Sequence, residues 1–509
     1  MLVTLTKLHR NVQIFSTILF STFSSVVAAA PPSSFSIVIK PLVVNGSVNA
    51  LDVRQTLHGD LPAIGTPLRL QAPLSVFGVK SIAERITDLN VTDALGAVPL
   101  SVEDDTAQAG YAMGYRNWQA SRTVEAPVII RYRIPTQPTA EGGGPPYGMK
   151  ASGNGVAGSG AGFLLLPINT TSTTTAFSWD LSALPTGSVG VITAGPGNIL
   201  VAGPPAELNT QWMLAGPAKT YSSTLARGFN AYFLGPQPFD TADMFDWAER
   251  GYAVLTRTLT YLDEPPYRLF FRGLKVPSYA TGTARVTGGG ALLTVGPTLG
   301  EQSLNNFKNT IFHEMTHQWV GHMEGAGPWF SEGLTTYLSA TLPCREKLAD
   351  VEFCADGVNA YANFYYSSRA RNWSLKRIDD IGSGDESIRR VPYGRGMLYF
   401  GLLNAQLLAK SHGHRDLLDV LAPMFSARNK GVALNISVWE SMLLRELGQS
   451  AVDQFKASVI DGSLTLIPPV NAFGPCLTRV TVDTIVTGSA ERVDGFAWRP
   501  IAGCKQEHR

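Results

Sequence analysis

Two histidines and a glutamate in the middle of the chain have the types and spacing of a metal-dependent hydrolytic site. Residues 311–320 read IFHEMTHQWV, so His313 and His317 are four positions apart. Four residues turn an α-helix by about 400°, which leaves the two imidazoles roughly 40° apart on one face. Both can therefore bind one zinc ion, with Glu314 beside them to act on a metal-bound water.

Catalytic zinc normally takes a third protein ligand, which has to come from downstream in this chain. His322 lies nine residues after His313, about 900° around a helix and so on the opposite face. Glu332 fits better, because the first helix can end within 321–327 and a second helix can begin at Pro328. The surrounding WFSEGLTTY is otherwise apolar, where an unpaired carboxylate would be costly.

These motifs resemble those of the gluzincin metallopeptidases, specifically the glycyl aminopeptidase family and the related membrane alanyl aminopeptidase/leukotriene hydrolase family. HEMTHQWVG followed by WFSEGLTTY carries the resemblance, and VPYGRG at 391–396 resembles their V-P-Y-x-K-G segment. The resemblance covers about residues 235–465 and implies a thermolysin-like, mainly helical zinc peptidase domain. It implies that one Zn²⁺ ion is the cofactor, with these ligands: His313, His317 and Glu332. It also implies that Glu314 is the general base and that Tyr393 stabilises the oxyanion.

One motif of these families has no counterpart in this sequence. The membrane alanyl aminopeptidases hold the free amine of the substrate with the glutamate of a Gly-Ala-Met-Glu-Asn motif. Gly288, Gly289 and Gly290 stand in the corresponding place. Their backbone could still pair with an extended peptide at a strand edge, so we expect these glycines to bind substrate. The choice between exopeptidase and endopeptidase stays open.

The first thirty residues have the order of a secretory signal peptide. A basic region with Lys7 and Arg10 precedes an apolar run over 12–27, and three alanines follow at 28–30. An uncleaved membrane anchor is the alternative, but the run is short and rich in Ser and Thr. We therefore expect an exported protein, periplasmic or secreted, with no stable membrane insertion after the signal peptide 1–30 is cleaved.

The four cysteines all follow the zinc motif. Export makes disulfides the preferred interpretation, because no C-x-x-C or Cys/His pair indicates a zinc site among them. Four cysteines allow three pairings. We expect the two local loops, Cys344–Cys354 and Cys476–Cys504.

Composition excludes several classes of protein. The chain has 509 residues, of which 44% are hydrophobic, so a sizeable core is available and wholesale disorder is excluded. Lys and Arg number 41 against 40 Asp and Glu, a net charge of +1. That balance gives no electrostatic footprint for nucleic acid. The expected partner, a peptide substrate, is implied by the resemblance to the peptidase families. The sequence does not indicate an oligomeric state.

The organisation along the chain predicts a multidomain α+β protein. Residues 31–235 read as a β-rich N-terminal domain, with strands expected at 35–40, 128–134, 177–181 and 188–193. Within it, 138–162 is rich in Gly and Pro and is expected to form a flexible surface loop. It contains G-x-G-x-x-G, which we discount because glycines and prolines precede it and Gly160 and Gly162 follow it, whereas the dinucleotide fingerprint needs a strand before it and a helix after it.

The chain becomes mainly helical after residue 235. Residues 236–427 read as the zinc peptidase domain, and 428–509 as a helical segment followed by a short β tail. The expected helices are 241–262, 304–323, 330–340, 396–410, 415–427, 438–447 and 451–460.

The function predicted from these observations is a zinc metallopeptidase, aminopeptidase-like and acting on exported or extracellular peptides. Two alternatives remain at this stage. One is a catalytically silent peptide-binding protein on the same fold, and the other is a zinc hydrolase acting on a non-peptide substrate.

Overall fold

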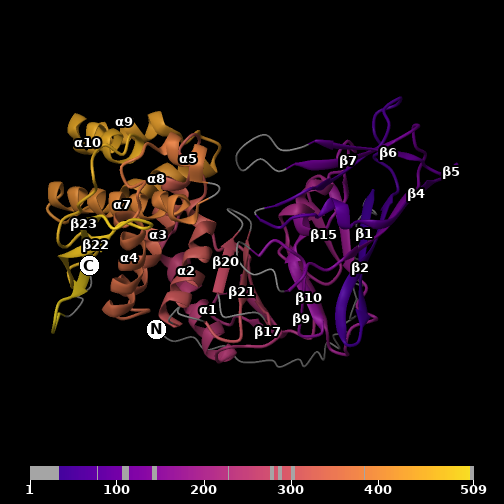
Figure 1. Cartoon of the computed structure of the whole chain (residues 1–509), viewed down its shortest axis with the longest axis horizontal. Helices are drawn as coiled ribbons and strands as arrows, with labels where there is room; N and C mark the ends of the chain where they lie inside the picture. Colours follow the sequence, from indigo (N-terminus) through magenta and orange to yellow (C-terminus); the bar gives the residue numbers. More distant parts are fainter. Residues whose placement is uncertain are drawn as a thin grey trace, which may run out of the picture. The chain divides into compact units, whose positions relative to one another are not determined.

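The computed structural model of the chain describes residues 34–76, 78–105, 114–139, 146–226, 228–275, 280–284, 289–299, 304–382 and 385–504. The predicted signal peptide lies outside these residues. Ser33–Arg509 forms one compact unit. Its N-terminal part is built from strands and its C-terminal part from helices (Figure 1). The predicted α+β class is therefore confirmed.

Two antiparallel-rich sheets enclose the core of the N-terminal part. Along β1 the side chains of Phe35, Ile37 and Ile39 are buried while those between them are more exposed, as period-two alternation predicts. The sheet orders are β15-β12-β1-β2-β8-β4-β5 and β11-β3-β7-β6. The strands of these two sheets are β1 (Phe35–Val44), β2 (Ser47–Leu57), β3 (Arg69–Pro73), β4 (Thr87–Asp93), β5 (Gly96–Ala97), β6 (Leu100–Asp105), β7 (Tyr115–Ala120), β8 (Val128–Pro135), β11 (Leu166–Pro167), β12 (Thr174–Trp179) and β15 (Ile199–Ala202).

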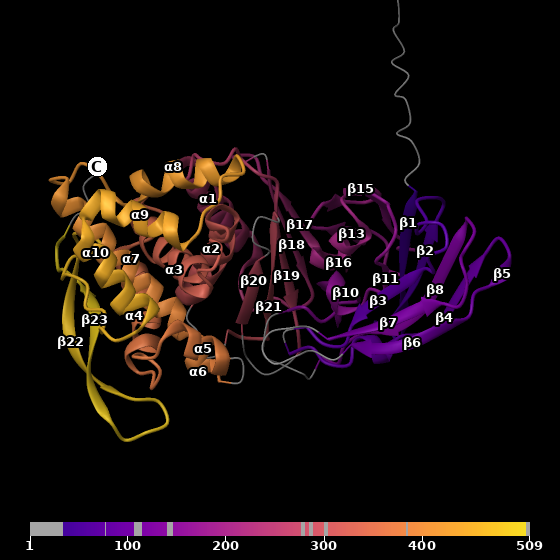
Figure 2. The same cartoon turned by 90° about the horizontal axis from the view of Figure 1, so that it is seen from above.

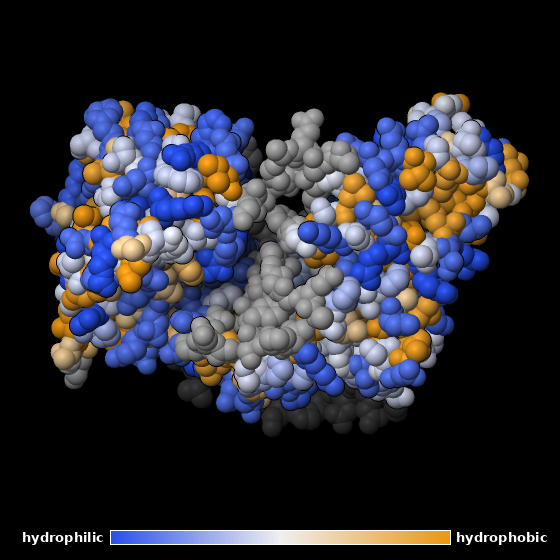
Figure 3. Space-filling model, viewed as in Figure 1, coloured by the Kyte–Doolittle hydropathy of each residue, from blue (hydrophilic) through white to orange (hydrophobic). Residues whose placement is uncertain are grey.

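Hydrophobic side chains gather on the surface over the N-terminal strands, whereas the visible face of the helical part is mostly hydrophilic (Figure 3). Leu95 and Val102 are among the exposed hydrophobic residues of this region. The edge strand β6 ends in exposed acidic residues, and Asp104 pairs with Arg116 on β7, with 2.7 Å between Oδ1 and Nε. Charge at the end of an edge strand disfavours pairing with a second chain.

The glycine-rich segment was predicted to be a flexible surface loop, and this prediction is wrong for its described part. Residues 146–162 form β9 (Lys150–Ser152), β10 (Gly155–Ser159) and a 3₁₀ turn, and they are mostly buried. They belong to a sheet of order β14-β13-β16-β10-β9. A Cβ on Gly155 would overlap the carbonyl oxygen of Ala215, and one on Gly158 would lie 2.6 Å from Met149 Cα. Glycine here permits backbones to approach closely and does not indicate mobility. The other strands of this sheet are β13 (Val189–Ile192), β14 (Gly195–Pro196) and β16 (Trp212–Gly216).

The sheet that lies next to the helices packs against the sheet that contains β9 and β10. Its order is β17-β18-β19-β21-β20, with β18, β19 and β21 parallel and β20 antiparallel at the edge. Trp212 from one sheet and Phe270 and Leu292 from the other share one hydrophobic cluster. The strands are β17 (Lys219–Ser222), β18 (Phe229–Leu234), β19 (Tyr267–Gly273), β20 (Ala280–Ala284) and β21 (Gly290–Val295).

A buried arginine fastens the two sheets together. The guanidinium of Arg272, on β19, donates from Nη1 to the carbonyl oxygens of Gly148 at 2.6 Å and Ala157 at 2.5 Å. Its Nη2 donates to Thr294 Oγ1 at 3.0 Å. Arg272 is 1% exposed, so these bonds replace the hydration that the charge loses.

Most of the helices match the regions expected from the sequence, but α4, α5 and α6 were not among them. Helices α2, α3, α4 and α7 pack around one hydrophobic core (Figure 1). This core also includes α1 and the sheet β17-β18-β19-β21-β20. The helices are α1 (Thr241–Thr258), α2 (Leu304–Val320), α3 (Pro328–Arg345), α4 (Val351–Tyr366), α5 (Leu375–Gly382), α6 (Glu386–Arg389), α7 (Val391–Lys410), α8 (Leu417–Asn429), α9 (Ile436–Leu447) and α10 (Gln449–Phe455), which continues as one π turn, Lys456–Ile460. None of the helices in the described ranges is long and apolar enough to span a bilayer.

The described part of the chain finishes with a hairpin of β22 (Leu477–Ile485) and β23 (Arg492–Pro500), which projects beside α4 (Figure 2). Asn359 on α4 exchanges two hydrogen bonds with the backbone of Trp498, at 2.8 and 2.7 Å. Both predicted disulfides are present, Cys344–Cys354 and Cys476–Cys504. The first closes the α3–α4 connection and the second closes the base of the hairpin.

Candidate metal and catalytic site

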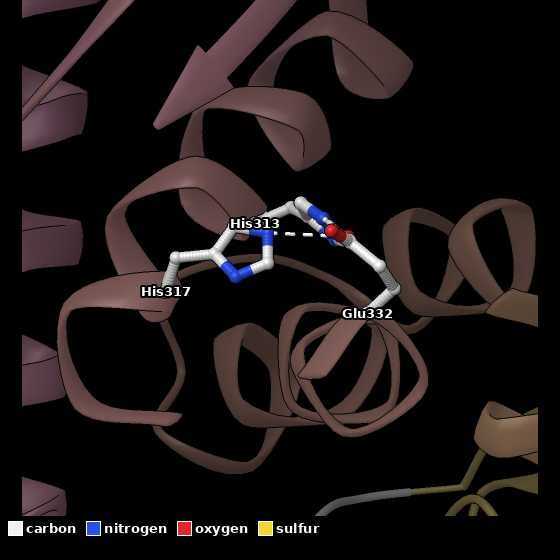
Figure 4. Close-up of side chains that lie close together, drawn as sticks. All are labelled: His313, His317 and Glu332. Atoms are coloured by element: carbon white, nitrogen blue, oxygen red, sulfur yellow. Dashed lines mark hydrogen bonds and ion pairs between the residues drawn. The ribbon is translucent and has the colours of Figure 1, made fainter. Parts of the chain in front are cut away.

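Two adjacent helices bring the three predicted metal ligands together. His313 and His317 lie on α2, and Glu332 faces them from α3 (Figure 4). Glu332 Oε2 lies 3.2 Å from Nε2 of each histidine. One ligand atom from each of the three residues lies within 4.8 Å of the others. Two imidazole nitrogens and a carboxylate oxygen at this separation are a donor set that suits zinc.

The turn between the two helices is the one that the sequence predicts. Helix α2 ends at Val320, and Gly321 follows with φ +63°, a conformation that favours glycine. Helix α3 begins at Pro328, which tolerates the first helical position because its missing N–H has no partner there. Arg428 of α8 donates to the last carbonyl oxygens of α2, including that of Trp319 at 3.2 Å. A cation is favourable at this end of a helix, so Arg428 helps to fix α2 in place.

Thr335 determines which nitrogen of His317 faces the site. Thr335 Oγ1 donates to the carbonyl oxygen of Ser331 at 2.6 Å, and it lies 3.3 Å from His317 Nδ1. Since the hydroxyl proton is used on Ser331, Nδ1 must carry the hydrogen and donate to Thr335. Nε2 then presents its lone pair toward Glu332, as a metal ligand requires.

The electrostatics of the triad also suit a cation. Burial disfavours the charged form of Glu332, but His317 and His313 hold its pKa well below the usual range for glutamate. Burial alone would lower the pKa of His317, yet the charges of Glu332 and Glu314 raise it. Two carboxylates therefore create a negative potential around two imidazoles that are each 4% exposed. A cation at this position would satisfy both the carboxylate and the histidine lone pairs, so the residues fit zinc.

Two tyrosines stand beside the first ligand. The rings of Tyr361, on α4, and Tyr393, on α7, each lie nearly parallel to that of His313, with centroids 6.3 and 6.4 Å away. Burial raises the pKa of Tyr361 to about 12 and that of Tyr393 well above its ordinary value. Both therefore keep their O–H groups, which can donate hydrogen bonds. Tyr393 was predicted from the sequence, and Tyr361 was not.

Glycines in the VPYGRG segment explain how Tyr393 reaches the site. A Cβ on Gly333 would lie 2.5 Å from Gly396 Cα, so α3 and α7 cross with almost no side chain between them. A Cβ on Gly394 would lie 2.9 Å from Tyr365 Cβ on α4. These contacts draw α7 against both neighbouring helices, which places Tyr393 near the residue that precedes Gly333, the ligand Glu332.

Glu314 lies on α2, whereas the predicted substrate-binding glycines stand at and directly before the first residue of β21. Glu314, between the two histidines on α2, is 8% exposed, and its backbone carbonyl accepts from Tyr267 Oη at 3.1 Å. Gly288 lies outside the described residues. Gly289 donates its N–H to Gln318 Oε1 at 2.7 Å, and its carbonyl accepts from Arg268 N at 2.8 Å. Substrate binding by Gly288, Gly289 and Gly290 stays a prediction, restricted by the fact that both backbone groups of Gly289 are already engaged.

Comparison with known proteins finds similar structures, whereas no family model and no curated protein matches the chain. A crystal structure of an aminopeptidase N family protein from Idiomarina loihiensis has a TM-score of 0.67 at 12% identity, over 88% of this chain and 79% of that one. This chain therefore shares its fold. An M1 zinc metallopeptidase from Deinococcus radiodurans has a TM-score of 0.47 at 16% identity, over 85% and 95% of the two chains. Leukotriene A4 hydrolase from Saccharomyces cerevisiae has a TM-score of 0.48 at 12% identity, over 86% and 68%.

Proposed function

We propose that this protein is a zinc-dependent metallopeptidase, aminopeptidase-like, that binds one Zn²⁺ ion through His313, His317 and Glu332. The convergence of these three side chains from two helices, within reach of a single ion, carries the proposal. The hydrogen bond from His317 to Thr335 supports it, because a histidine with its Nε2 lone pair oriented in advance is what a metal site needs.

The surrounding residues supply the rest of the chemistry of peptide hydrolysis. Zinc, when bound, polarises the scissile carbonyl and lowers the pKa of water toward ~7. Glu314 takes the proton from the attacking water and passes it to the leaving amine. The hydroxyl of Tyr393 donates to the oxygen that becomes negatively charged in the transition state.

We also propose the domain bounds and the location of the protein, as predicted from the sequence. Residues 1–30 are a cleaved signal peptide, 31–235 a β-rich domain, 236–427 the peptidase domain and 428–509 a C-terminal helical segment with a β tail. The protein is exported and acts on exported or extracellular peptides. The two disulfides support export, since such bonds persist in oxidising compartments.

Glu314→Gln tests the catalytic assignment. The substitution keeps the size of the side chain and removes its basicity, so zinc content should be unchanged while peptide cleavage falls at least about 100-fold. Glu352→Gln is the matched control, because Glu352 is exposed in the first turn of α4. Zinc by mass spectrometry and cleavage of a peptide library should be measured on wild type and both variants. Equal turnover of wild type and Glu314→Gln would contradict the proposal.

The same peptide library separates the two alternative functions. Stoichiometric zinc with no cleaved peptide would favour hydrolysis of a non-peptide bond, and absence of zinc would favour a catalytically silent peptide-binding protein. Paired peptides with free and N-acetylated termini distinguish aminopeptidase from endopeptidase action. An aminopeptidase cleaves the free peptide and leaves the acetylated one intact.

A further inference from the structure

Arg389, which has no part in the proposed catalytic steps, contacts the hydroxyl of Tyr393. Arg389 is the last residue of α6, one turn before Tyr393 in α7. Its Nη1 donates to Tyr393 Oη at 3.5 Å, and its guanidinium carbon lies 5.9 Å from the tyrosine ring centroid. No family motif in the sequence indicated Arg389, because it precedes VPYGRG.

The guanidinium of Arg389 is held in a fixed orientation by Glu386. Arg389 Nε and Nη2 each donate to a separate carboxylate oxygen of Glu386 at 2.7 Å. A bidentate pair of this kind fixes the plane of the guanidinium and leaves Nη1 directed elsewhere. Glu386 and Arg389 are three residues apart on α6, and Tyr393 follows four residues later in the first turn of α7.

We propose that Arg389 is a positioning residue that orients the Tyr393 hydroxyl toward the substrate carbonyl. This inference rests on the proposed peptidase function. A tyrosine hydroxyl has one hydrogen to donate and lone pairs that accept. Since the hydrogen bond from Arg389 occupies a lone pair of Oη, the O–H is left to point away from the arginine. A hydroxyl that accepts a hydrogen bond from a cation also donates a stronger hydrogen bond to a developing negative charge.

Arg390, the next residue, provides a matched comparison. It also pairs with Glu386, but its guanidinium lies over the ring of Phe364, 4.7 Å from the centroid. The two arginines therefore share a carboxylate and lie next to each other directly before α7, and they differ in the contact with Tyr393. A general effect of positive charge or of local folding should be seen on removing either one.

A double-mutant cycle tests the proposal. Arg389→Ala should lower kcat about tenfold with little change in KM, less than the loss from removing an oxyanion donor outright. In a Tyr393→Phe background, Arg389→Ala should have no further effect, because the hydroxyl through which it acts is gone. Arg390→Ala should leave kcat within about twofold of wild type. Zinc content and thermal unfolding of every variant show that the site is intact, and Arg389→Gln replaces Arg389→Ala if the latter fails to fold.

Other results would overturn the proposal. If Arg389→Ala lowered kcat equally in the wild-type and Tyr393→Phe backgrounds, or if both arginine variants lost activity equally, Arg389 would act independently of the hydroxyl. A rise in KM for peptides with a free C-terminus, and none for their amides, would make Arg389 a substrate carboxylate ligand. Both results leave the peptidase function standing. A folded, zinc-loaded wild type that cleaves no peptide would refute the proposed function and this inference with it.

Discussion

Glycines permit close backbone contacts in two different parts of this chain. In the N-terminal part, Gly155 and Gly158 let strands approach until a single added Cβ would overlap a neighbouring backbone. In the helical part, Gly333 and Gly396 do the same where α3 crosses α7. The first contact packs β10 against β16 within one sheet, whereas the second sets the distance between a metal ligand and Tyr393.

The contacts at Gly155 and Gly396 differ in the groups whose positions they determine. Composition cannot distinguish the two, and it suggested a flexible loop for the first. The packing partner distinguishes them, because a shift at Gly396 moves catalytic groups while a shift at Gly155 moves structural strands. We therefore expect similar costs in stability from the two sites and different costs in activity.

The largest effect should come from Gly396→Ala, compared with Gly155→Ala. The added Cβ meets the carbonyl oxygen of Trp329 in the first variant and that of Ala215 in the second. Each should lower the free energy of unfolding by about 1–3 kcal/mol. Gly396→Ala should also reduce kcat per zinc-loaded molecule at least about tenfold, because it separates α3 from α7. Denaturant unfolding and turnover per bound zinc check both expectations.

The comparison would fail if Gly155→Ala reduced turnover per bound zinc as strongly as Gly396→Ala. That result would mean that the packing of the N-terminal sheets controls the geometry of the site as directly as the helix crossing does.

A smaller effect is expected from Thr335→Val, which removes the acceptor for His317 Nδ1. Zinc affinity should fall on the order of tenfold, since loss of a partner behind a ligand typically costs 10–100-fold. Thr336→Val is the control, because Thr336 is fully buried and its hydroxyl has no partner in the described part of the chain. Competition with a zinc chelator measures both affinities. Equal affinities for the two variants would show that Thr335 does not orient His317.

The sequence predicted those parts of the site whose geometry follows from the spacing of residues along the chain. His313 and His317 share a helical face because of a four-residue interval, and Glu332 reaches them because Gly321 and Pro328 delimit a short turn. The cysteine pairings followed from two local loops. Such features depend on residues close together in the chain.

Features that depend on distant partners could not be predicted in the same way. Tyr361 stands beside His313 because α4 packs against α2, and Arg272 joins segments that lie more than a hundred residues apart. The glycines of 146–162 looked mobile because the sequence does not show the backbones that close in on them. In each case the missing information was the identity of the neighbouring element.

Zinc content of the purified protein tests the central claim most directly. Wild type should hold one zinc ion per chain, and His317→Ala should hold none after dialysis against a weak chelator. His322→Ala should keep the full ion, because His322 is exposed beyond the end of α2 and contributes no ligand atom to the triad. Zinc retained by His317→Ala, or lost from His322→Ala, would contradict the account.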